Sequence, residues 1–194
     1  MDIFKSYDNI KCVLNGEEME SKLLENSMEH LVSIMEDWLD RYEYSRDFEA
    51  LMSIVENDYL YSGTLYRGIT LLKDSRNIED KIEYIGAQSF SKKKSIAIDF
   101  ANNNKVTTKY EINEIKEDSE VIPVIIEITI DKVGVDLHKF SEDLIKVCKS
   151  SISNKELSSD FEELLGYAID EEEVLLNPYT LRNNKDSISI YDIG

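Results

Sequence analysis

Apolar residues in the first part of the chain recur at three- and four-residue steps, with charged residues between them. This spacing is typical of amphipathic helices, and it predicts one helix from Glu18 to about Asp40 and another from Asp47 to Asp58. Asp47 is the candidate N-cap of the second helix. We expect the apolar faces of both helices to pack in the core rather than to bind a cofactor. These faces carry Met19, Leu23, Leu24, Met28, Leu31, Ile34, Met35, Trp38 and Leu39, and then Phe48, Leu51, Met52 and Val55.

After Ser62 and Gly63 the pattern changes to short runs rich in β-branched and aromatic residues, which predict strands. Short helices are expected at residues 91–101, with Ser91 as N-cap, and at 141–149, while the polar residues 150–159 predict an exposed loop. Helices followed by a mostly β region indicate the α+β class. We expect a helical part, residues 1–62, and a core, residues 63–194, in one compact domain. The predicted strands are 64–70, 83–90, 105–112, 121–130, 173–178 and 187–193.

Composition narrows the possible functions. The chain has 194 residues, enough for one domain with a substantial core, and its 40 acidic and 22 basic residues give a formal charge of -18. Such a surface repels phosphate backbones, so we expect no general nucleic-acid binding. Two distant cysteines, Cys12 and Cys148, argue against a disulfide framework or a four-ligand zinc site. Without a signal peptide or an apolar stretch long enough to span a bilayer, we expect a cytosolic protein that does not bind membranes.

The first candidate for chemistry is Arg67 in the run LYRG, residues 65–68. A cation inside a predicted buried strand needs an anionic partner, and a guanidinium offers a rigid fork of donors that suits a phosphate or a carboxylate. Gly68, which follows, lets a ligand approach the backbone closely. A structural salt bridge with one of the many carboxylates is the alternative explanation for Arg67.

The second candidate is Ser89, at the end of a predicted strand. Ser91 is expected to cap the helix that follows, whereas Ser89 has no such need. Its hydroxyl could orient a neighbouring carboxylate or contact a ligand. An ordinary serine at a strand end is the alternative.

The third candidate is the run DEEEVLL, residues 170–176, in which acidic residues lead directly into an apolar strand. Residues two apart in a strand share a face, so Glu171 and Glu173 are expected to point the same way and Glu172 the opposite way. One carboxylate of such a pair can stabilise a sugar cation while the other activates a nucleophile. An acidic strand end in an acidic protein is the alternative explanation.

Other kinds of site find little support in the sequence. Carboxylates could bind a hard cation, but the alternation of a calcium-binding loop is missing, and His30 and His138 are too far apart for a local zinc motif. We expect both histidines to be structural and predict no metal site. No nucleophilic triad and no glycine-rich phosphate loop are recognisable.

In chain order, these three elements resemble the motifs of one enzyme family. LYRG (65–68), SFSKKKSIAIDFA (89–101) and DEEEVLLNP (170–178) are similar to the motifs of the arginine, serine, glutamate class of mono-ADP-ribosyltransferases. The likeness runs from Thr64 to the C-terminus. It points most to bacteriophage enzymes of the Mod type and to the catalytic domains of bacterial binary toxins. The resemblance implies an ADP-ribosyltransferase fold, with N-terminal helices packed on a two-sheet β core.

The resemblance also implies how NAD, the co-substrate, is bound. Arg67 is expected to hold the phosphate or ribose region, and the Gly68 backbone to hydrogen-bond the nicotinamide amide. Phe100 is expected to pack near the nicotinamide ring, and Ser89 to orient the catalytic glutamate. That glutamate is Glu173, which would bind the nicotinamide ribose and stabilise the oxocarbenium-like state as nicotinamide leaves.

The acceptor side of the reaction is implied in the same way. Glu171 is expected to align or activate the acceptor, and a glutamate at this position goes with arginine as the modified residue. Phe161 and Tyr167, expected in a loop before the glutamates, are the candidates for recognising the acceptor. The acceptor itself is expected to be a protein in the cytosol of a bacterial host or a target cell.

Two departures from the family pattern and two rival functions remain. Phe90 stands where the family usually has threonine. The run after Phe100 lacks an arginine that many relatives direct at the phosphates, so Lys105 or the asparagines at 102–104 are possible substitutes. The rival functions are a non-catalytic acidic protein that binds or inhibits a basic partner, and an NAD glycohydrolase.

Overall fold

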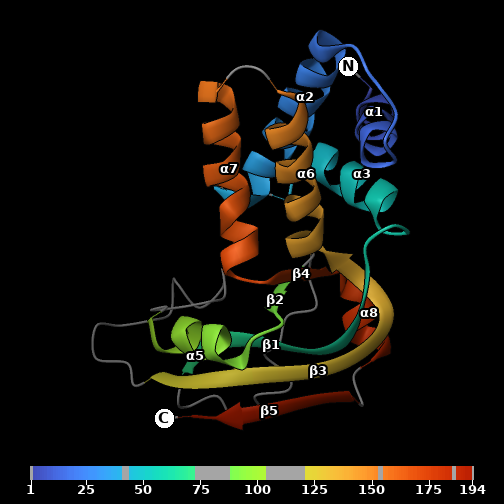
Figure 1. The fold of residues 1–194 in the computed structure, drawn as a ribbon. Helices are drawn as coiled ribbons and strands as arrows, with labels where there is room; N and C mark the ends of the chain where they lie inside the picture. Colours follow the sequence, from blue (N-terminus) through green and yellow to red (C-terminus); the bar gives the residue numbers. More distant parts are fainter. Residues whose placement is uncertain are drawn as a thin grey trace. The chain divides into compact units, whose positions relative to one another are not determined.

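The computed structural model describes residues 2–40, 44–72, 88–103, 121–152, 155–184 and 187–193. The chain divides into two compact units (Figure 1). A helical unit comprises Met1–Leu60 and Val135–Glu172, and a sheet unit comprises Tyr61–Gly134 and Glu173–Gly194. The division predicted from the sequence, between residues 62 and 63, lies two residues after the point where the chain first passes from the helical unit to the sheet unit. It places the second helical segment, 135–172, with the β-rich core, whereas the structure groups that segment with the N-terminal helices.

In the helical unit, α2 lies at the centre and contacts each of the other four helices (Figure 1). The prediction of two amphipathic helices in this region is confirmed, although Ser45 rather than Asp47 caps α3, because the Ser45 hydroxyl accepts the Phe48 N–H at 3.1 Å. The unit also contains a helix that the sequence analysis did not assign, α1. The helices are α1 (Ile3–Leu14), α2 (Ser21–Leu39), α3 (Arg46–Val55), α6 (Leu137–Ser151) and α7 (Lys155–Asp170).

The apolar faces predicted for α2 and α3 form the core of this unit. Met28, Leu31 and Met35 of α2 are fully buried, as are Phe48 and Leu51 of α3. Trp38 stacks on Phe48 with ring centroids 5.3 Å apart. The expectation that the methionine and aromatic positions serve packing is confirmed at these positions.

The sheet unit is built on one five-stranded sheet with the strand order β1-β2-β4-β3-β5. A further pairing of β1 with β3 closes the first four strands of this order into a ring. The long, curved β1 and β3 run through the unit in Figure 1. Helices together with this sheet confirm the α+β class, while the described strands join in one sheet rather than two. The elements are β1 (Leu60–Leu72), β2 (Gln88–Ser91), α5 (Lys94–Asn103), β3 (Val121–Asp136), β4 (Glu173–Leu176), α8 (Pro178–Asn183) and β5 (Ile188–Asp192).

Two apolar clusters form the core of the sheet unit. The larger one gathers side chains from β1 to β4 and from α8, among them Leu65, Phe90 and Val174. The smaller one joins Ala97 and Ala101 of α5 to Ile125 of β3. Helix α5 is therefore fixed to the sheet beside the strand that carries the LYRG motif.

The predicted strands and helices differ from the structure at several boundaries. The loop expected at residues 150–159 is wrong, because α6 extends to Ser151 and α7 already begins at Lys155. The strand expected at 173–178 ends at Leu176, where Asn177 caps α8. Of the strand predicted at 83–90, only residues 88–90 lie in the described part of the chain, and the strand predicted at 105–112 lies outside it.

Candidate functional site

Arg67 lies in the middle of β1, and its side chain is half-buried. Its Nη1 donates a hydrogen bond to the backbone carbonyl of Ser89 on β2 at 2.7 Å. Burial lowers the pKa of the Arg67 guanidinium to about 10, and the negative charge of Glu173 acts in the opposite direction. Arg67 therefore remains a cation at neutral pH, in a partly desolvated position near a carboxylate.

Glu173 is the first residue of β4, and its side chain is only 3% exposed. A buried carboxylate needs compensating charge or hydrogen bonds, and Arg67 provides charge of the right sign in the same sheet. Both residues were predicted from the sequence as site residues, and both lie in the sheet unit, where the charge of Glu173 acts on Arg67.

The register between β2 and β4 decides which serine lies beside Glu173. Ser91 is directly opposite Glu173, whereas Ser89 is opposite Leu175. Tyr66 of β1 is in turn opposite Ser91, so one row across three strands joins Tyr66, Ser91 and Glu173. Ser89 contributes its backbone carbonyl to Arg67. The serine singled out from the sequence therefore contacts the arginine through its main chain, and the direct neighbour of Glu173 is Ser91.

Ser91 is not the N-cap of the helix that follows. Helix α5 begins at Lys94, three residues further on, so the predicted cap is wrong. The Ser91 hydroxyl nevertheless accepts the backbone N–H of Lys93 at 3.0 Å, just before the helix. This short-range bond holds the connection between β2 and α5 in place.

Glu171 and Glu172 lie in a turn rather than in a strand. The N–H of Glu171 donates to Tyr167 O at 3.0 Å and that of Glu172 to Ile169 O at 3.1 Å, so both residues close the end of α7. The prediction that strand alternation aligns Glu171 with Glu173 is wrong, because β4 begins only at Glu173. Glu171 belongs to the helical unit and Glu173 to the sheet unit.

Gly68 allows a close approach, but the group that approaches is helix α5. A Cβ at this position would overlap the carbonyl oxygen of Ala97 and lie 2.6 Å from the Ala101 nitrogen. On the same helix, Phe100 has 36% of its surface exposed, although most large apolar side chains are buried. Gly68 therefore determines how closely the helix that carries Phe100 packs on β1.

Phe161 and Tyr167 lie on helix α7, so the prediction that they belong to a loop is wrong. Phe161 is 7% exposed and packs in the core of the helical unit, which makes it a structural residue rather than a surface for an acceptor. Tyr167 is 50% exposed. It is the only one of this pair that a partner protein can reach.

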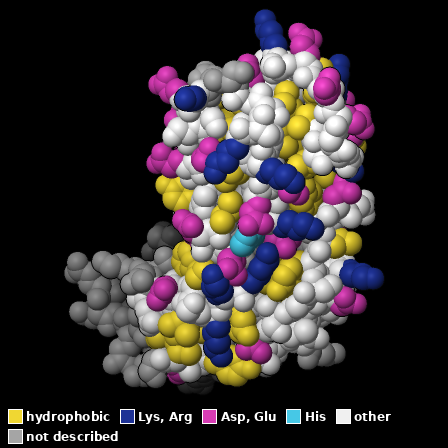
Figure 2. Space-filling model, in the orientation of Figure 1, with side chains coloured by type: hydrophobic (Ala, Val, Ile, Leu, Met, Phe, Trp, Pro, Cys, Tyr) yellow, Lys and Arg dark blue, Asp and Glu magenta, His cyan; other side chains and the backbone are white. Residues whose placement is uncertain are grey.

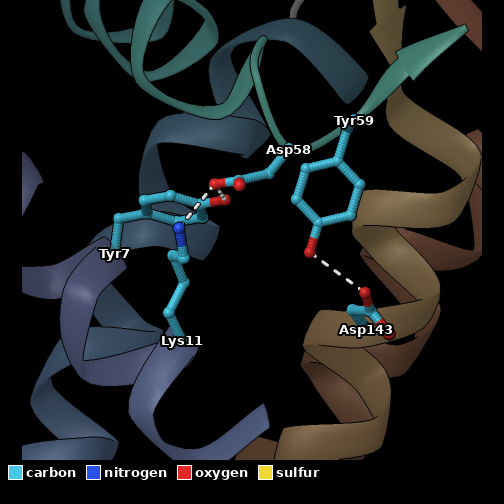
Figure 3. Close-up of polar contacts among 5 residues, drawn as sticks. All are labelled: Tyr7, Lys11, Asp58, Tyr59 and Asp143. Carbon is cyan, nitrogen blue, oxygen red and sulfur yellow. Dashed lines mark hydrogen bonds and ion pairs between the residues drawn. The ribbon is translucent and has the colours of Figure 1, made fainter. Parts of the chain in front are cut away.

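A polar network in the helical unit escaped the sequence analysis (Figure 3). The Tyr7 hydroxyl and Lys11 Nζ, both on α1, donate to Asp58 Oδ2 at 2.7 and 2.8 Å, and the Tyr59 hydroxyl donates to Asp143 Oδ2 of α6 at 3.0 Å. Burial is the main cause that raises the pKa of Tyr7 and of Tyr59, so both phenols stay neutral donors. No sequence motif links residues this far apart, and the network ties α1 and α6 to the segment after α3.

Both histidines make structural contacts within the helical unit. His30 Nδ1 lies 2.9 Å from Ser6 Oγ, and His138 Nε2 lies 3.2 Å from Glu142 Oε1. In the described ranges of the chain, no group of three or more His, Cys, Asp or Glu residues is placed to hold a metal ion. Among the helices described, none is long and apolar enough to cross a membrane.

Comparison of the chain with protein-family models, with curated protein sequences and with solved structures gave no significant match.

Proposed function

We propose that the chain is an NAD-dependent mono-ADP-ribosyltransferase that transfers ADP-ribose to a protein side chain, with arginine as the acceptor. The observation that carries the proposal is the buried carboxylate of Glu173, whose negative charge acts on the partly desolvated guanidinium of Arg67 in the same sheet. A sheltered carboxylate beside a cation suits a reaction in which a sugar cation develops next to a pyrophosphate. The order of the Arg, Ser-x-Ser and Glu-x-Glu motifs adds to this support.

In the proposed reaction, the bond between the nicotinamide nitrogen and C1′ of the ribose breaks, and its electron pair leaves with nicotinamide. A bond then forms between C1′ and a guanidinium nitrogen of the acceptor, which loses a proton. Glu173 stabilises the positive charge that develops on the ribose, and Glu171 takes the proton from the acceptor. A preorganised contact of this kind typically contributes about 100- to 1000-fold in rate.

Arg67 is suited to hold NAD because its orientation is already fixed. One of its N–H groups is bound to the Ser89 carbonyl, which sets the plane of the guanidinium. A guanidinium carries five N–H donors, and phosphate oxygens suit the fork they form. Phe100, exposed on α5, stays the candidate to pack near the nicotinamide ring, and the Gly68 backbone the candidate to bind its amide.

The proposal is tested by incubating the purified chain with NAD and following nicotinamide release, then adding labelled NAD to bacterial lysate and mapping the modified residue by mass spectrometry. We expect Glu173→Gln to abolish both release and transfer. Glu171→Gln is expected to spare release more than transfer. Glu172→Gln is the matched control, because it removes one negative charge at the position between Glu171 and Glu173. This variant should keep both nicotinamide release and transfer.

Three results would contradict parts of this assignment. Normal transfer by the Glu173→Gln variant excludes Glu173 as the catalytic carboxylate. Release without any labelled acceptor indicates an NAD glycohydrolase, and no release at all leaves a non-catalytic acidic binding protein. The mapped residue decides whether arginine is the acceptor.

Tyr167 is the proposed contact for the acceptor protein, which we place in the cytosol of a bacterial host or target cell. We expect Tyr167→Ala to reduce labelling of the acceptor while NAD binding is unchanged, because the exposed ring is free to meet a protein surface. Equal losses of labelling and of NAD binding count against this role.

A further inference from the structure

We propose that Ser91, and not Ser89, is the positioning residue for the carboxylate of Glu173. The catalytic consequence rests on the proposed function. The pairing of Ser91 with Glu173 rests only on the register of the sheet, so its effect on the carboxylate can be tested without NAD.

Strand register favours Ser91. Directly opposed residues on antiparallel strands point to the same face, with their Cβ atoms roughly 4.5–5.5 Å apart, whereas diagonal neighbours are roughly 7–8 Å apart. Ser91 is directly opposite Glu173, and Ser89 is a diagonal neighbour, opposite Leu175. A serine hydroxyl lies only one bond beyond Cβ. The hydroxyl of Ser91 therefore has less distance to span to the Glu173 carboxylate than the hydroxyl of Ser89 has.

Hydrogen-bond chemistry favours the same residue. A serine hydroxyl has one donor and two acceptor positions. The Ser91 oxygen accepts the N–H of Lys93 at 3.0 Å, which fixes the oxygen and leaves the hydroxyl proton to serve an acceptor. Ser91 is 6% and Glu173 3% exposed, so bulk water competes little for that proton. The carboxylate on the facing strand is an acceptor of the right charge.

Two groups of neighbouring strands can therefore act on the carboxylate of Glu173. Arg67 supplies positive charge from β1, and Ser91 supplies a hydroxyl from β2. Through the Lys93 N–H, Ser91 is also tied to the segment that starts α5, the helix that carries Phe100. Ser91 therefore links the position of the carboxylate to that of the helix beside it.

The test compares Ser91→Ala with Ser89→Ala, the same change two residues away on the same face of β2. In the free protein, NMR of the side-chain carboxyl carbon reports the pKa of Glu173. Loss of a hydrogen bond to the charged form raises that pKa, and we expect Ser91→Ala to raise it by about one unit while Ser89→Ala leaves it unchanged. Ser91→Thr, which keeps the hydroxyl, should restore the value of the original protein.

Kinetics of nicotinamide release give a second readout. We expect Ser91→Ala to lower kcat about tenfold with little change in KM, because one hydrogen bond of the active carboxylate is lost. If Ser91→Ala fails to fold, as judged by circular dichroism, Ser91→Cys keeps the shape with a weaker donor and should shift the pKa of Glu173 in the same direction.

The proposal is overturned if Ser89→Ala moves the pKa of Glu173 and the Ser91 variants do not, or if neither position moves it. Absence of nicotinamide release by the unmodified chain overturns the proposed enzyme, while the NMR comparison still decides the role of Ser91. The two failures are therefore distinguishable.

Discussion

Glu172 has a left-handed backbone conformation, with φ at 47°, that residues with a side chain rarely adopt. It follows the end of α7, and its N–H donates to Ile169 O at 3.1 Å, an arrangement in which helices usually place glycine. We therefore expect Glu172→Gly to raise the free energy of unfolding by about 0.5–1 kcal/mol, measured by urea denaturation. Glu172→Ala keeps the strain and is the control. A less stable glycine variant contradicts this account of the turn.

The same turn shows what the acidic run could and could not reveal. Four acidic residues followed by an apolar run predict a strand start, and β4 does start inside the run. The pattern does not tell where the preceding helix ends, because acidic residues suit a helix, a turn or a strand end. Glu173 was therefore identified correctly as a strand residue, while the alignment of Glu171 with it was not.

At the scale of elements, α5 depends on the absence of a side chain at Gly68. A Cβ there would overlap the backbone of α5 at Ala97, and backbone cannot move aside as a side chain can. We expect Gly68→Ala to destabilise the sheet unit by roughly 2 kcal/mol or more, measured by urea denaturation.

Gly166 in α7 provides the matched control for Gly68. Nothing lies within 4 Å of a Cβ added there, so Gly166→Ala should stabilise the protein by about 0.5–1 kcal/mol through helix propensity alone. If Gly68→Ala is as well tolerated as Gly166→Ala, the packing of α5 on β1 is looser than the geometry indicates.

The junction after α3 depends on Asp58. Hydrogen bonds from Lys11 and then from Tyr7 are the main causes that lower the pKa of this carboxyl. A carboxyl with a lowered pKa stabilises the fold above its unfolded value of about 3.9, and that contribution is lost as the pH falls toward the folded value.

Asp58→Asn should therefore cost roughly 0.2–1 kcal/mol at pH 6, since the pair with Lys11 is partly exposed, and should reduce the loss of stability between pH 6 and pH 3. Urea denaturation at both pH values checks this. Asp8→Asn removes the same charge from an exposed position of α1 and is the control. An equal acid response in the two variants excludes Asp58 as a source of the pH dependence.

Sequence periodicity predicted some elements well and others poorly, for physical reasons. Helices α2 and α3 have continuous apolar faces, so their local pattern suffices. The start of α7 is polar, and tertiary contacts of Phe161, Leu165 and Ala168 hold it as a helix. The choice between Ser89 and Ser91 is a question of register, and a shift of two residues keeps both serines on the same face. The pattern of apolar and polar residues therefore cannot tell whether Ser89 or Ser91 lies opposite Glu173.

At the scale of the whole chain, each unit is assembled from two separate segments. Composition changes after residue 62, which suggested a division there, but α6 and α7 return to pack on α2. This packing depends on which apolar faces fit together, and at least 98 positions of the chain separate α2 from α6 and α7. A helical region and a sheet region could therefore be predicted from the sequence. Which unit the segment 135–172 belongs to could not be predicted.

The net charge of the chain favours unfolding at neutral pH. With 40 acidic and 22 basic residues, the formal charge is -18. Figure 2 shows acidic side chains spread over the visible face among Lys and Arg side chains rather than confined to one patch. Compact folding brings these like charges together. Exposed ion pairs such as Lys11 with Asp58 and Lys149 with Glu162 oppose this, but each contributes only about 0–1 kcal/mol.

Added salt should therefore raise the free energy of unfolding of this protein rather than lower it. Raising NaCl from about 0.01 to 0.15 M shortens the Debye length from about 30 to 8 Å, which screens repulsion between distant carboxylates more than attraction within close pairs. We expect the free energy of unfolding at pH 7, from urea denaturation, to rise over this range. Near pH 4.5, the isoelectric point of the sequence, the rise should disappear. A fall in stability with salt at pH 7 would mean that the ion pairs outweigh the net repulsion.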